Sequence, residues 1–263
     1  MGRRSFFSGD HPVVVAHRGA SGTHPENTLE AFSAAFKAGA EAVELDVRLT
    51  SDGVAVAFHD PDVSRTTGAE GQIHAMKLAD LKRLDASAGL GPRTEVPTLR
   101  EVLDLASGRG GVMLEMKNIP GEPGFDPTEE GAVEAALEAL ETFEGPALIA
   151  SFNPRSIERC RERCRNHSDQ IPSGFLATAA MDPAIALRYA KEVGHEWVLP
   201  NVTALWSAGQ PFVEGAHSAG VRVGTWVVDE ARRMETLFSW GVDAIATNLP
   251  EVAVPVRDAF RAR

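Results

Sequence analysis

Nine short apolar runs are spaced along the chain, and longer segments with apolar residues at every third or fourth position separate most of them. The runs cover residues 13–17, 42–47, 54–59, 111–117, 147–152, 173–177, 197–201, 221–228 and 243–247. Runs without regular polar alternation are typical of strands that are covered on both faces, as in a parallel sheet. The alternation of strand and helix therefore predicts an α/β protein with a parallel sheet.

Two segments carry sequences that are typical of helix starts. "TLRE" at Thr98 to Glu101 matches a capping box. "NTLE" at Asn27 to Glu30 offers an N-cap residue at Asn27, and Gly39 is the expected helix stop. These signals place one helix after the first apolar run and another before the fourth.

The second and third runs are joined by "TSDG" at residues 50–53, which is a turn sequence and too short for a helix. We expect these two strands to pair antiparallel, so that eight parallel strands remain. Eight is the number in a TIM-type (β/α)8 barrel. The hairpin would then rise from the barrel mouth after the second barrel strand and bring His59 beside the segment from Glu44 to Asp46.

Chain length and charge limit the organisation and the partners. With 263 residues and 43% hydrophobic content, we expect a single barrel domain over residues 1–263, with residues 60–97 as a small insertion over the mouth. The net charge of −11, with both signs interspersed, excludes nucleic acid as a partner and favours a small-molecule substrate.

The length of the apolar runs bears on where the protein is located. No run approaches about 18 residues, so we expect no integral membrane association, and no signal-length apolar segment follows the basic N-terminus. We therefore expect a cytoplasmic protein, either a monomer or a homo-oligomer. Cys160 and Cys164 lie four residues apart on a predicted helix, and we expect both to be free thiols in a reducing compartment.

Acidic side chains interrupt two of the apolar runs near their carboxyl ends. Strand residues two apart share a face, so Glu44 and Asp46 point the same way, as do Glu115 and Lys117. Three carboxylates at one barrel mouth would repel one another unless a cation compensates them, and oxygen ligands favour Mg²⁺ or Ca²⁺. The alternative is that these acids pair with Arg or Lys on neighbouring strands.

Two histidines also stand at the ends of apolar runs. Imidazole exchanges a proton near neutral pH, so His17 and His59 beside a metal site suggest a general acid/base pair. Arg18 and Lys117 could hold an anion such as a phosphate group, although Arg18 could instead brace Glu26. Together these residue types point to phosphoryl transfer.

Several segments, in this order along the chain, resemble the glycerophosphodiester phosphodiesterase family. They are "AHRGASGTHPENTLEAF", "VELDVRLTSDGVAVAFHD", "DVSRTTGAEGQI", "VPTLREVLDL", "MLEMK" and "GVDAIATNLPE", and they span nearly the whole chain. The resemblance implies a TIM-type barrel that hydrolyses glycerophosphodiesters to glycerol 3-phosphate and an alcohol, with one divalent cation.

The resemblance also implies roles for individual residues. His17 and His59 look like the acid/base pair, Arg18 and Lys117 like phosphate contacts, and Asn27 like a residue near the first loop. The metal ligands would be Glu44, Asp46 and Glu115. Which histidine is the acid, and whether water or the glycerol 2-hydroxyl attacks first, both remain open.

Two segments depart from the family pattern, in a region that bears on the leaving group. "WVVDE" near Trp226 and "TNLPE" around Asn248 differ from the family's Trp-Thr-Val-Asn and Thr-Asp-Arg-Pro. Trp226 and Phe152 are candidates for the pocket wall, although either could simply fill the barrel. Two rival functions remain: a lysophospholipase D-like hydrolase acting on a lipid diester, and a non-catalytic phosphodiester-binding module.

Overall fold

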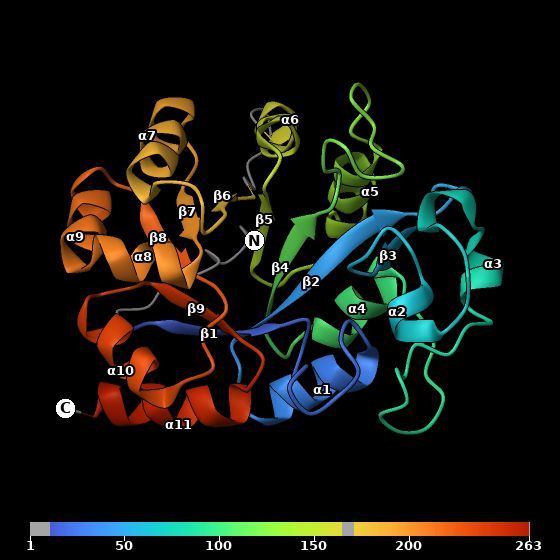
Figure 1. Ribbon diagram of the computed structural model, residues 1–263, viewed down its shortest axis with the longest axis horizontal. Helices are drawn as coiled ribbons and strands as arrows, with labels where there is room; N and C mark the ends of the chain where they lie inside the picture. Colours follow the sequence, from blue (N-terminus) through green and yellow to red (C-terminus); the bar gives the residue numbers. More distant parts are fainter. Residues whose placement is uncertain (1–10, 165–170, 263) are drawn as a thin grey trace.

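Eight parallel strands close into a ring in the computed structural model, which describes residues 11–164 and 171–262 (Figure 1). The strands are β1 (Val13–His17), β2 (Ala42–Leu49), β4 (Gly111–Met116), β5 (Ala147–Ser151), β6 (Ser173–Ala177), β7 (Trp197–Pro200), β8 (Arg222–Thr225) and β9 (Ala244–Thr247). Their order is β1-β9-β8-β7-β6-β5-β4-β2, and pairing of β2 with β1 closes the ring. The predicted TIM-type barrel is confirmed.

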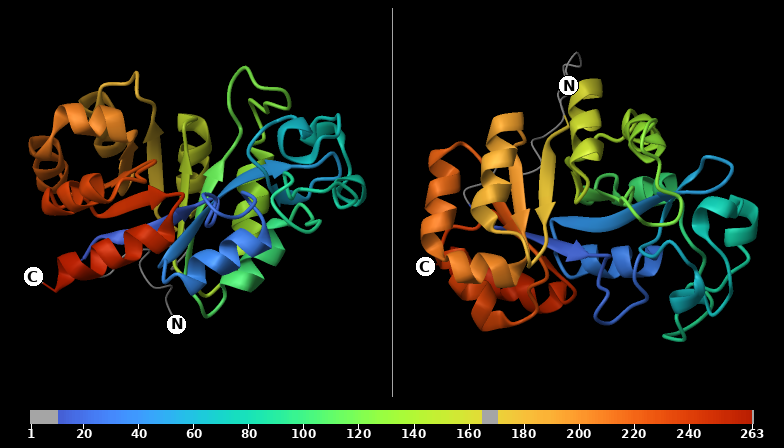
Figure 2. Two further views of the ribbon diagram at one scale, coloured as in Figure 1. Left: turned by 60° about the horizontal axis from the view of Figure 1, so that its bottom comes forward. Right: turned by 45° about the horizontal axis from the view of Figure 1, so that its top comes forward.

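Helices surround this ring on its outer side (Figure 2). They are α1 (Leu29–Lys37), α4 (Leu99–Ala106), α5 (Gly131–Leu140), α6 (Pro154–Cys164), α7 (Pro183–Val193), α8 (Val202–Ala208), α9 (Gln210–Ser218), α10 (Ala231–Ser239) and α11 (Pro250–Arg261). Cys160 and Cys164 are buried on α6, and neither forms a disulfide. None of the helices in the described segments combines the length and the apolar character that crossing a bilayer requires.

The two faces of each strand build two separate cores. Outward residues such as Val14 and Leu45 pack against the helices, whereas inward residues such as Val15 and Met113 fill the barrel. On the inner face of β1, β2 and β4, the side chains change from apolar to polar as the strand approaches its carboxyl end. The same alternation therefore carries His17 inward on β1.

Helix α4 begins as predicted, but α1 begins one residue later than predicted. Thr98 forms the expected capping box with Glu101. At α1 the N-cap is Thr28, whose hydroxyl accepts from the Ala31 N–H at 3.2 Å. Asn27 has a positive φ of 56°, and its side chain hydrogen-bonds Asp46 instead of the helix. Because the Asn27 side chain is engaged by Asp46, the next residue, Thr28, caps the helix instead.

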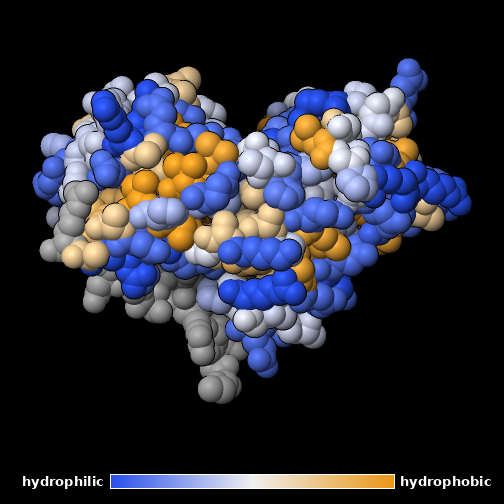
Figure 3. All heavy atoms as spheres, turned by 90° about the horizontal axis from the view of Figure 1, so that it is seen from below, coloured by the Kyte–Doolittle hydropathy of each residue, from blue (hydrophilic) through white to orange (hydrophobic). Residues whose placement is uncertain are grey.

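The outer surface is mixed in character. On the face seen from below in Figure 3, patches of apolar residues alternate with hydrophilic ones. Among large apolar residues in the described segments, Leu90, Ile185 and Trp206 are exposed, and they come from separate parts of the chain.

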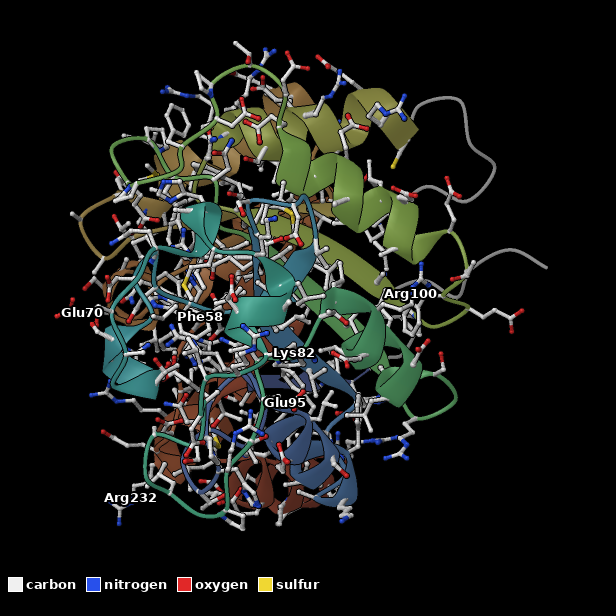
Figure 4. All side chains as sticks on the ribbon, turned by 90° about the vertical axis from the view of Figure 1, so that its right-hand side faces the viewer. Phe58, Glu70, Lys82, Glu95, Arg100 and Arg232 are labelled. Atoms are coloured by element: carbon white, nitrogen blue, oxygen red, sulfur yellow. The ribbon has the colours of Figure 1, made fainter. Side chains whose placement is uncertain are left out.

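Strand β3 (Ala55–Ala57) pairs antiparallel with β2 and leads into a segment with its own small core. This segment contains α2 (Ser64–Thr67), the 3₁₀ helix η1 (Ile73–Ala75) and α3 (Leu78–Leu81). Its core contains Val56, Phe58, Val63, Ile73, Leu81, Ala86 and Val96. Lys82 links this segment to α4, because its Nζ lies 2.6 Å from Glu101 Oε2. Figure 4 labels Lys82 and the core residue Phe58. That this segment covers the mouth stays a prediction.

The first loop packs so closely on α1 that only glycine fits at position 19. Gly19 has φ of 80°, and a Cβ there would lie 2.6 Å from the carbonyl carbon of Ala31. Gly53, in the β2–β3 turn, has φ of 77° but no atom within 4 Å of the same position. Both glycines have a positive φ, but only Gly19 lies too close to another segment to accommodate a Cβ atom.

We expect Gly53→Ala to lower the free energy of unfolding by about 1 kcal/mol, the cost of a side chain in the left-handed region. Gly19→Ala should cost about 1–3 kcal/mol more, because the added methyl group overpacks the contact with α1. Urea denaturation of both variants measures the difference. Equal losses would show that the approach to Ala31 does not constrain the loop that carries His17.

Candidate active site

Three carboxyl groups meet inside the barrel near the carboxyl ends of β2 and β4. Glu44, Asp46 and Glu115 are 1%, 0% and 7% exposed, and one oxygen of each lies within 4.8 Å of the others. The strand register sets Asp46 directly beside Glu115, and Glu44 lies two residues earlier on the same face. The parity of the two strands thus places all three on one side.

Two cations neutralise part of this charge. Arg18 Nε lies 3.1 Å from Asp46 Oδ2, and Lys117 Nζ lies 3.0 Å from Asp46 Oδ1 and also contacts Glu115. Arg18 Nη1 reaches Glu26 Oε1 at 3.1 Å as well. The pairings considered as the alternative to metal binding are therefore present, yet two cations face three buried carboxyl groups.

Glu44 shows directly that this compensation is incomplete. Its Oε2 accepts from the backbone N–H of Arg18 at 2.8 Å, but its buried Oε1 finds no hydrogen-bond donor among the described residues. Burial, followed by the charges of Asp46 and Glu115, raises the pKa of Glu44 well above its usual value. A buried oxygen without a partner, in a set of hard oxygen donors, fits a divalent cation.

The other two carboxyl groups differ from each other. Burial acts to raise the pKa of Asp46, but the charges of Lys117 and Arg18 outweigh it and hold that pKa well below its usual range. Burial dominates at Glu115 and raises its pKa despite the opposing charge of Lys117. Without a cation, Asp46 is therefore the member of the trio most strongly held in its charged form.

The two histidines approach this cluster from different strands. His17 ends β1, and burial together with the charge of Arg18 lowers its pKa to about 4. His59 follows β3, and burial lowers its pKa against the charge of Asp46. The charge of Asp46 acts to raise the pKa of both histidines and the charges of Arg18 and Lys117 act to lower it, so both rings lie within electrostatic range of this group.

Each histidine has a different partner at Nδ1. His17 Nδ1 lies 2.8 Å from the amide oxygen of Asn248, whereas His59 Nδ1 lies 2.6 Å from a carboxylate oxygen of Asp60. The backbone carbonyl of His59 also accepts from Arg48 Nε at 2.7 Å. Both rings are therefore held in fixed positions.

Phe152 and Trp226 extend the apolar interior toward the cluster. Their rings meet edge to face, with centroids 5.3 Å apart, and both pack against the barrel interior. Lys117 Nζ lies 6.0 Å from the Phe152 centroid. Trp226 Nε1 donates to the carbonyl of Leu199 at 2.9 Å, which fixes the indole. Their contact with a substrate stays a prediction.

An open cavity of about 490 Å³ adjoins the cluster. Its lining residues are His17, Arg18, Ser21, Gly22, Glu26, Asp229, Asn248 and Leu249. Two of the predicted site residues therefore face a space that can admit a small molecule. A smaller cavity of about 110 Å³ lies beside Lys117 and Arg48.

Sequence reasoning missed several polar contacts of the site. Asn27 Nδ2 donates to Asp46 Oδ2 at 2.7 Å, and Arg65 bridges Glu26 and Asp60. The two segments that depart from the family pattern also touch, because Asn248 Nδ2 donates to Asp229 Oδ2 at 2.8 Å. One indication of this last contact was present in the sequence: Asp229 and Asn248 lie in the two segments that depart from the family pattern, and a carboxylate and an amide can pair.

Comparison with known proteins finds a family and several relatives that match most of this chain. The model of the glycerophosphoryl diester phosphodiesterase family matches residues 17–252. A glycerophosphodiester phosphodiesterase of Caldanaerobacter subterraneus subsp. tengcongensis is 34% identical, covering 92% of this chain and 96% of that protein. One from Bacillus altitudinis is 31% identical, covering 94% of this chain and 99% of that protein.

Solved structures agree with these sequence matches. A phosphodiesterase of Oleispira antarctica, solved in complex with the product sn-glycerol-3-phosphate, superposes with a TM-score of 0.84 at 29% identity, covering 97% of this chain and 100% of that one. A glycerophosphodiester phosphodiesterase of Thermotoga maritima gives 0.76 at 25% identity, with 94% and 99% covered.

We expect Mg²⁺ or Ca²⁺ to stabilise the protein against heat, because a cation would relieve the repulsion among the three carboxylates. At a concentration 100 times the Kd the gain is about 2.7 kcal/mol, or roughly 5–10 °C in Tm for a chain of this size. Differential scanning calorimetry with each ion measures the shift.

Glu44→Gln should remove most of this response without lowering the Tm of the cation-free protein, since a neutral amide replaces a carboxyl group whose charged form is disfavoured by burial and by Asp46 and Glu115. Glu70→Gln, an exposed change in the 60–97 segment, should respond as the wild type does. If neither ion shifts the wild-type Tm at millimolar concentration, the metal site is refuted.

Proposed function

This chain belongs to the glycerophosphoryl diester phosphodiesterase family, and from that premise we propose that it hydrolyses small glycerophosphodiesters to glycerol 3-phosphate and an alcohol. Membership makes the chain a phosphodiesterase. One observation carries the more specific proposal: Arg18 and Lys117 both contact Asp46 in the carboxyl cluster, and His17 and Arg18 line the open cavity beside it. The glycerol 3-phosphate bound to the Oleispira antarctica relative supports the same substrate class.

Glu44, Asp46 and Glu115 would hold one divalent cation, Mg²⁺ or Ca²⁺. The unpartnered Glu44 oxygen and the all-oxygen donor set support this assignment. When bound, such an ion acts as a Lewis acid toward a phosphoryl oxygen and offsets developing negative charge.

Arg18 and Lys117 would bind the non-bridging oxygens of the phosphodiester. Both now contact Asp46, and a positive ion among the carboxylates would weaken those contacts by competition. Arg18 also lines the open cavity, so its guanidinium can reach an entering anion. A guanidinium and an ammonium on one phosphoryl group stabilise the charge that increases in the transition state.

His17 and His59 would move the two protons that hydrolysis requires. The attacking hydroxyl, from water or from the glycerol 2-position, loses its proton to one imidazole as its oxygen bonds to phosphorus. The bond from phosphorus to the leaving oxygen breaks, and the other imidazole gives that oxygen a proton. The lowered pKa of both rings leaves either one able to accept the proton of the attacking hydroxyl at neutral pH, and the ring that acts as the acid must take up a proton before it protonates the leaving oxygen.

Two further parts of the chain belong to this proposal. Phe152 and Trp226 would form an apolar wall beside the reacting groups. The 60–97 segment would cover one side of the mouth within a single domain over residues 1–263. Arg65 supports this, because its Nη2 lies 2.6 Å from Glu26 in the first loop.

We expect the purified protein to release glycerol 3-phosphate from glycerophosphocholine when Mg²⁺ or Ca²⁺ is present, and to lose that activity in excess chelator. Coupled oxidation of the product by glycerol-3-phosphate dehydrogenase measures the rate. Lysophosphatidylcholine, assayed in parallel by choline release, should react far more slowly. Faster release from the lipid would replace the proposed substrate class, and binding without turnover of either compound would indicate a non-catalytic module.

In the same assay, His17→Ala and His59→Ala should each lower kcat about 10²- to 10⁴-fold, the usual contribution of a general acid or base. His217→Ala is the matched control, since His217 pairs with Asp243 on an exposed part of the barrel away from the cluster. That variant should retain wild-type kcat. A loss smaller than about 10-fold in either test variant would remove that histidine from proton transfer.

A further inference from the structure

A pair of residues outside the proposed catalytic set lies behind His17. Asp229 follows β8 and Asn248 follows β9, so the two loops meet beside the end of β1. Asp229 Oδ1 accepts from the Asn248 backbone N–H at 2.8 Å and from the Thr247 hydroxyl at 2.9 Å. Asp229 Oδ2 lies 2.8 Å from the side-chain nitrogen of Asn248. Three donors thus converge on one carboxylate.

These contacts determine which way the Asn248 amide faces. A carboxylate only accepts hydrogen bonds, so the NH₂ group of Asn248 must face Asp229. The amide oxygen then faces the other side, where His17 Nδ1 lies at 2.8 Å and the Ser21 hydroxyl at 2.9 Å. Because that oxygen has no proton to give, His17 Nδ1 must be the donor.

We propose that Asp229 and Asn248 are positioning residues that hold His17 in the tautomer with Nδ1 protonated and Nε2 bare. Ser21 completes the support, because its hydroxyl lies 2.6 Å from the His17 carbonyl and also contacts Asn248. The inference rests on the proposed function only for its catalytic consequence. A bare Nε2 on His17 is the form that can accept the proton of the attacking hydroxyl.

The arrangement differs from that at the second histidine. His59 Nδ1 meets the Asp60 carboxylate directly, and Arg65 Nε holds the other oxygen of Asp60. At His17 an amide stands between the ring and the carboxylate. The amide orders the ring without placing another full negative charge next to the Glu44, Asp46 and Glu115 cluster.

A single substitution at Asp229 should reverse the direction of the hydrogen bonds that join Asp229, Asn248 and His17. In Asp229→Asn, the new amide oxygen must accept from the Asn248 backbone N–H and the Thr247 hydroxyl. Its NH₂ group then faces the Asn248 NH₂ group, and Asn248 avoids this clash of donors by turning its amide over. Asn248 would then donate to His17 Nδ1, which forces the proton to Nε2.

Exchanging both residues restores a matched pair. In the double variant Asp229→Asn/Asn248→Asp, the amide at 229 donates to the carboxylate at 248, and the carboxylate accepts from His17 Nδ1. The required tautomer returns. In the Ser-His-Asp triad the wrong tautomer lowers kcat by ~10⁴-fold, so a large effect is chemically reasonable here.

The kinetic test follows glycerol 3-phosphate release from glycerophosphocholine with Mg²⁺. We expect Asp229→Asn to lower kcat at least 10-fold with KM changed less than about 3-fold, and the double variant to recover at least half of that loss on a logarithmic scale. Asp243→Asn is the matched control: Asp243 accepts from the Val223 N–H and contacts His217, both at 2.8 Å, before β9 begins. It should keep wild-type kcat.

A spectroscopic test reads the tautomer without any turnover. Long-range ¹H–¹⁵N correlation spectra of histidine-labelled protein, with His17 assigned by comparison with His17→Ala, should show Nδ1 protonated in the wild type and Nε2 protonated in Asp229→Asn. A smaller loss of kcat, no recovery in the double variant, or an Nε2-protonated wild type would overturn the inference. If the wild type hydrolyses no glycerophosphodiester but shows the expected tautomers, the proposed function fails and the positioning pair stands.

Discussion

Repulsion among three carboxyl groups inside the barrel is the constraint that organises this molecule. Glu44, Asp46 and Glu115 lie within 4.8 Å of one another where they are almost fully shielded from water. Such a cluster raises the free energy of the folded state unless positive charge compensates it. Arg18 and Lys117 supply part of that charge, and the unpartnered Glu44 oxygen marks where compensation remains incomplete. The same deficit that destabilises the cluster makes it a binding site for a cation.

The loops around the cluster hold its cationic and imidazole groups in place. Arg48 is buried and donates to the carbonyls of both His59 and Lys117, so one side chain joins the loop after β3 to the end of β4. Asn27 fixes Asp46 from the first loop, and Asn248 holds His17 from the last. Loops that are far apart in sequence thus depend on one another through short polar contacts. The catalytic proposal requires this rigidity, since proton transfer needs groups held at hydrogen-bond distance.

The alternation of strand and helix segments, with one hairpin strand set aside, was sufficient to predict the barrel. Residue parity was sufficient to place Glu44 and Asp46 on one face of their strand, because parity does not depend on distant structure. His17 was placed near them by its position at the end of an apolar run. Hydrogen-bond partners in loops were not predictable in this way. Asn27 is by residue type the better N-cap, and only its tertiary bond to Asp46 leaves that position to Thr28. The Asp229–Asn248 contact depends on two loop conformations that no local pattern encodes, although the family pattern had singled out both segments.

Diffraction from crystals soaked in Mn²⁺ tests the central claim most directly, since its anomalous signal locates an ion without reference to activity. We expect a single strong peak among the oxygens of Glu44, Asp46 and Glu115, with the Arg18 and Lys117 side chains moved away from Asp46. An empty cluster in soaked crystals, with Arg18 and Lys117 still bound to Asp46, would contradict the claim that these carboxylates form a metal site.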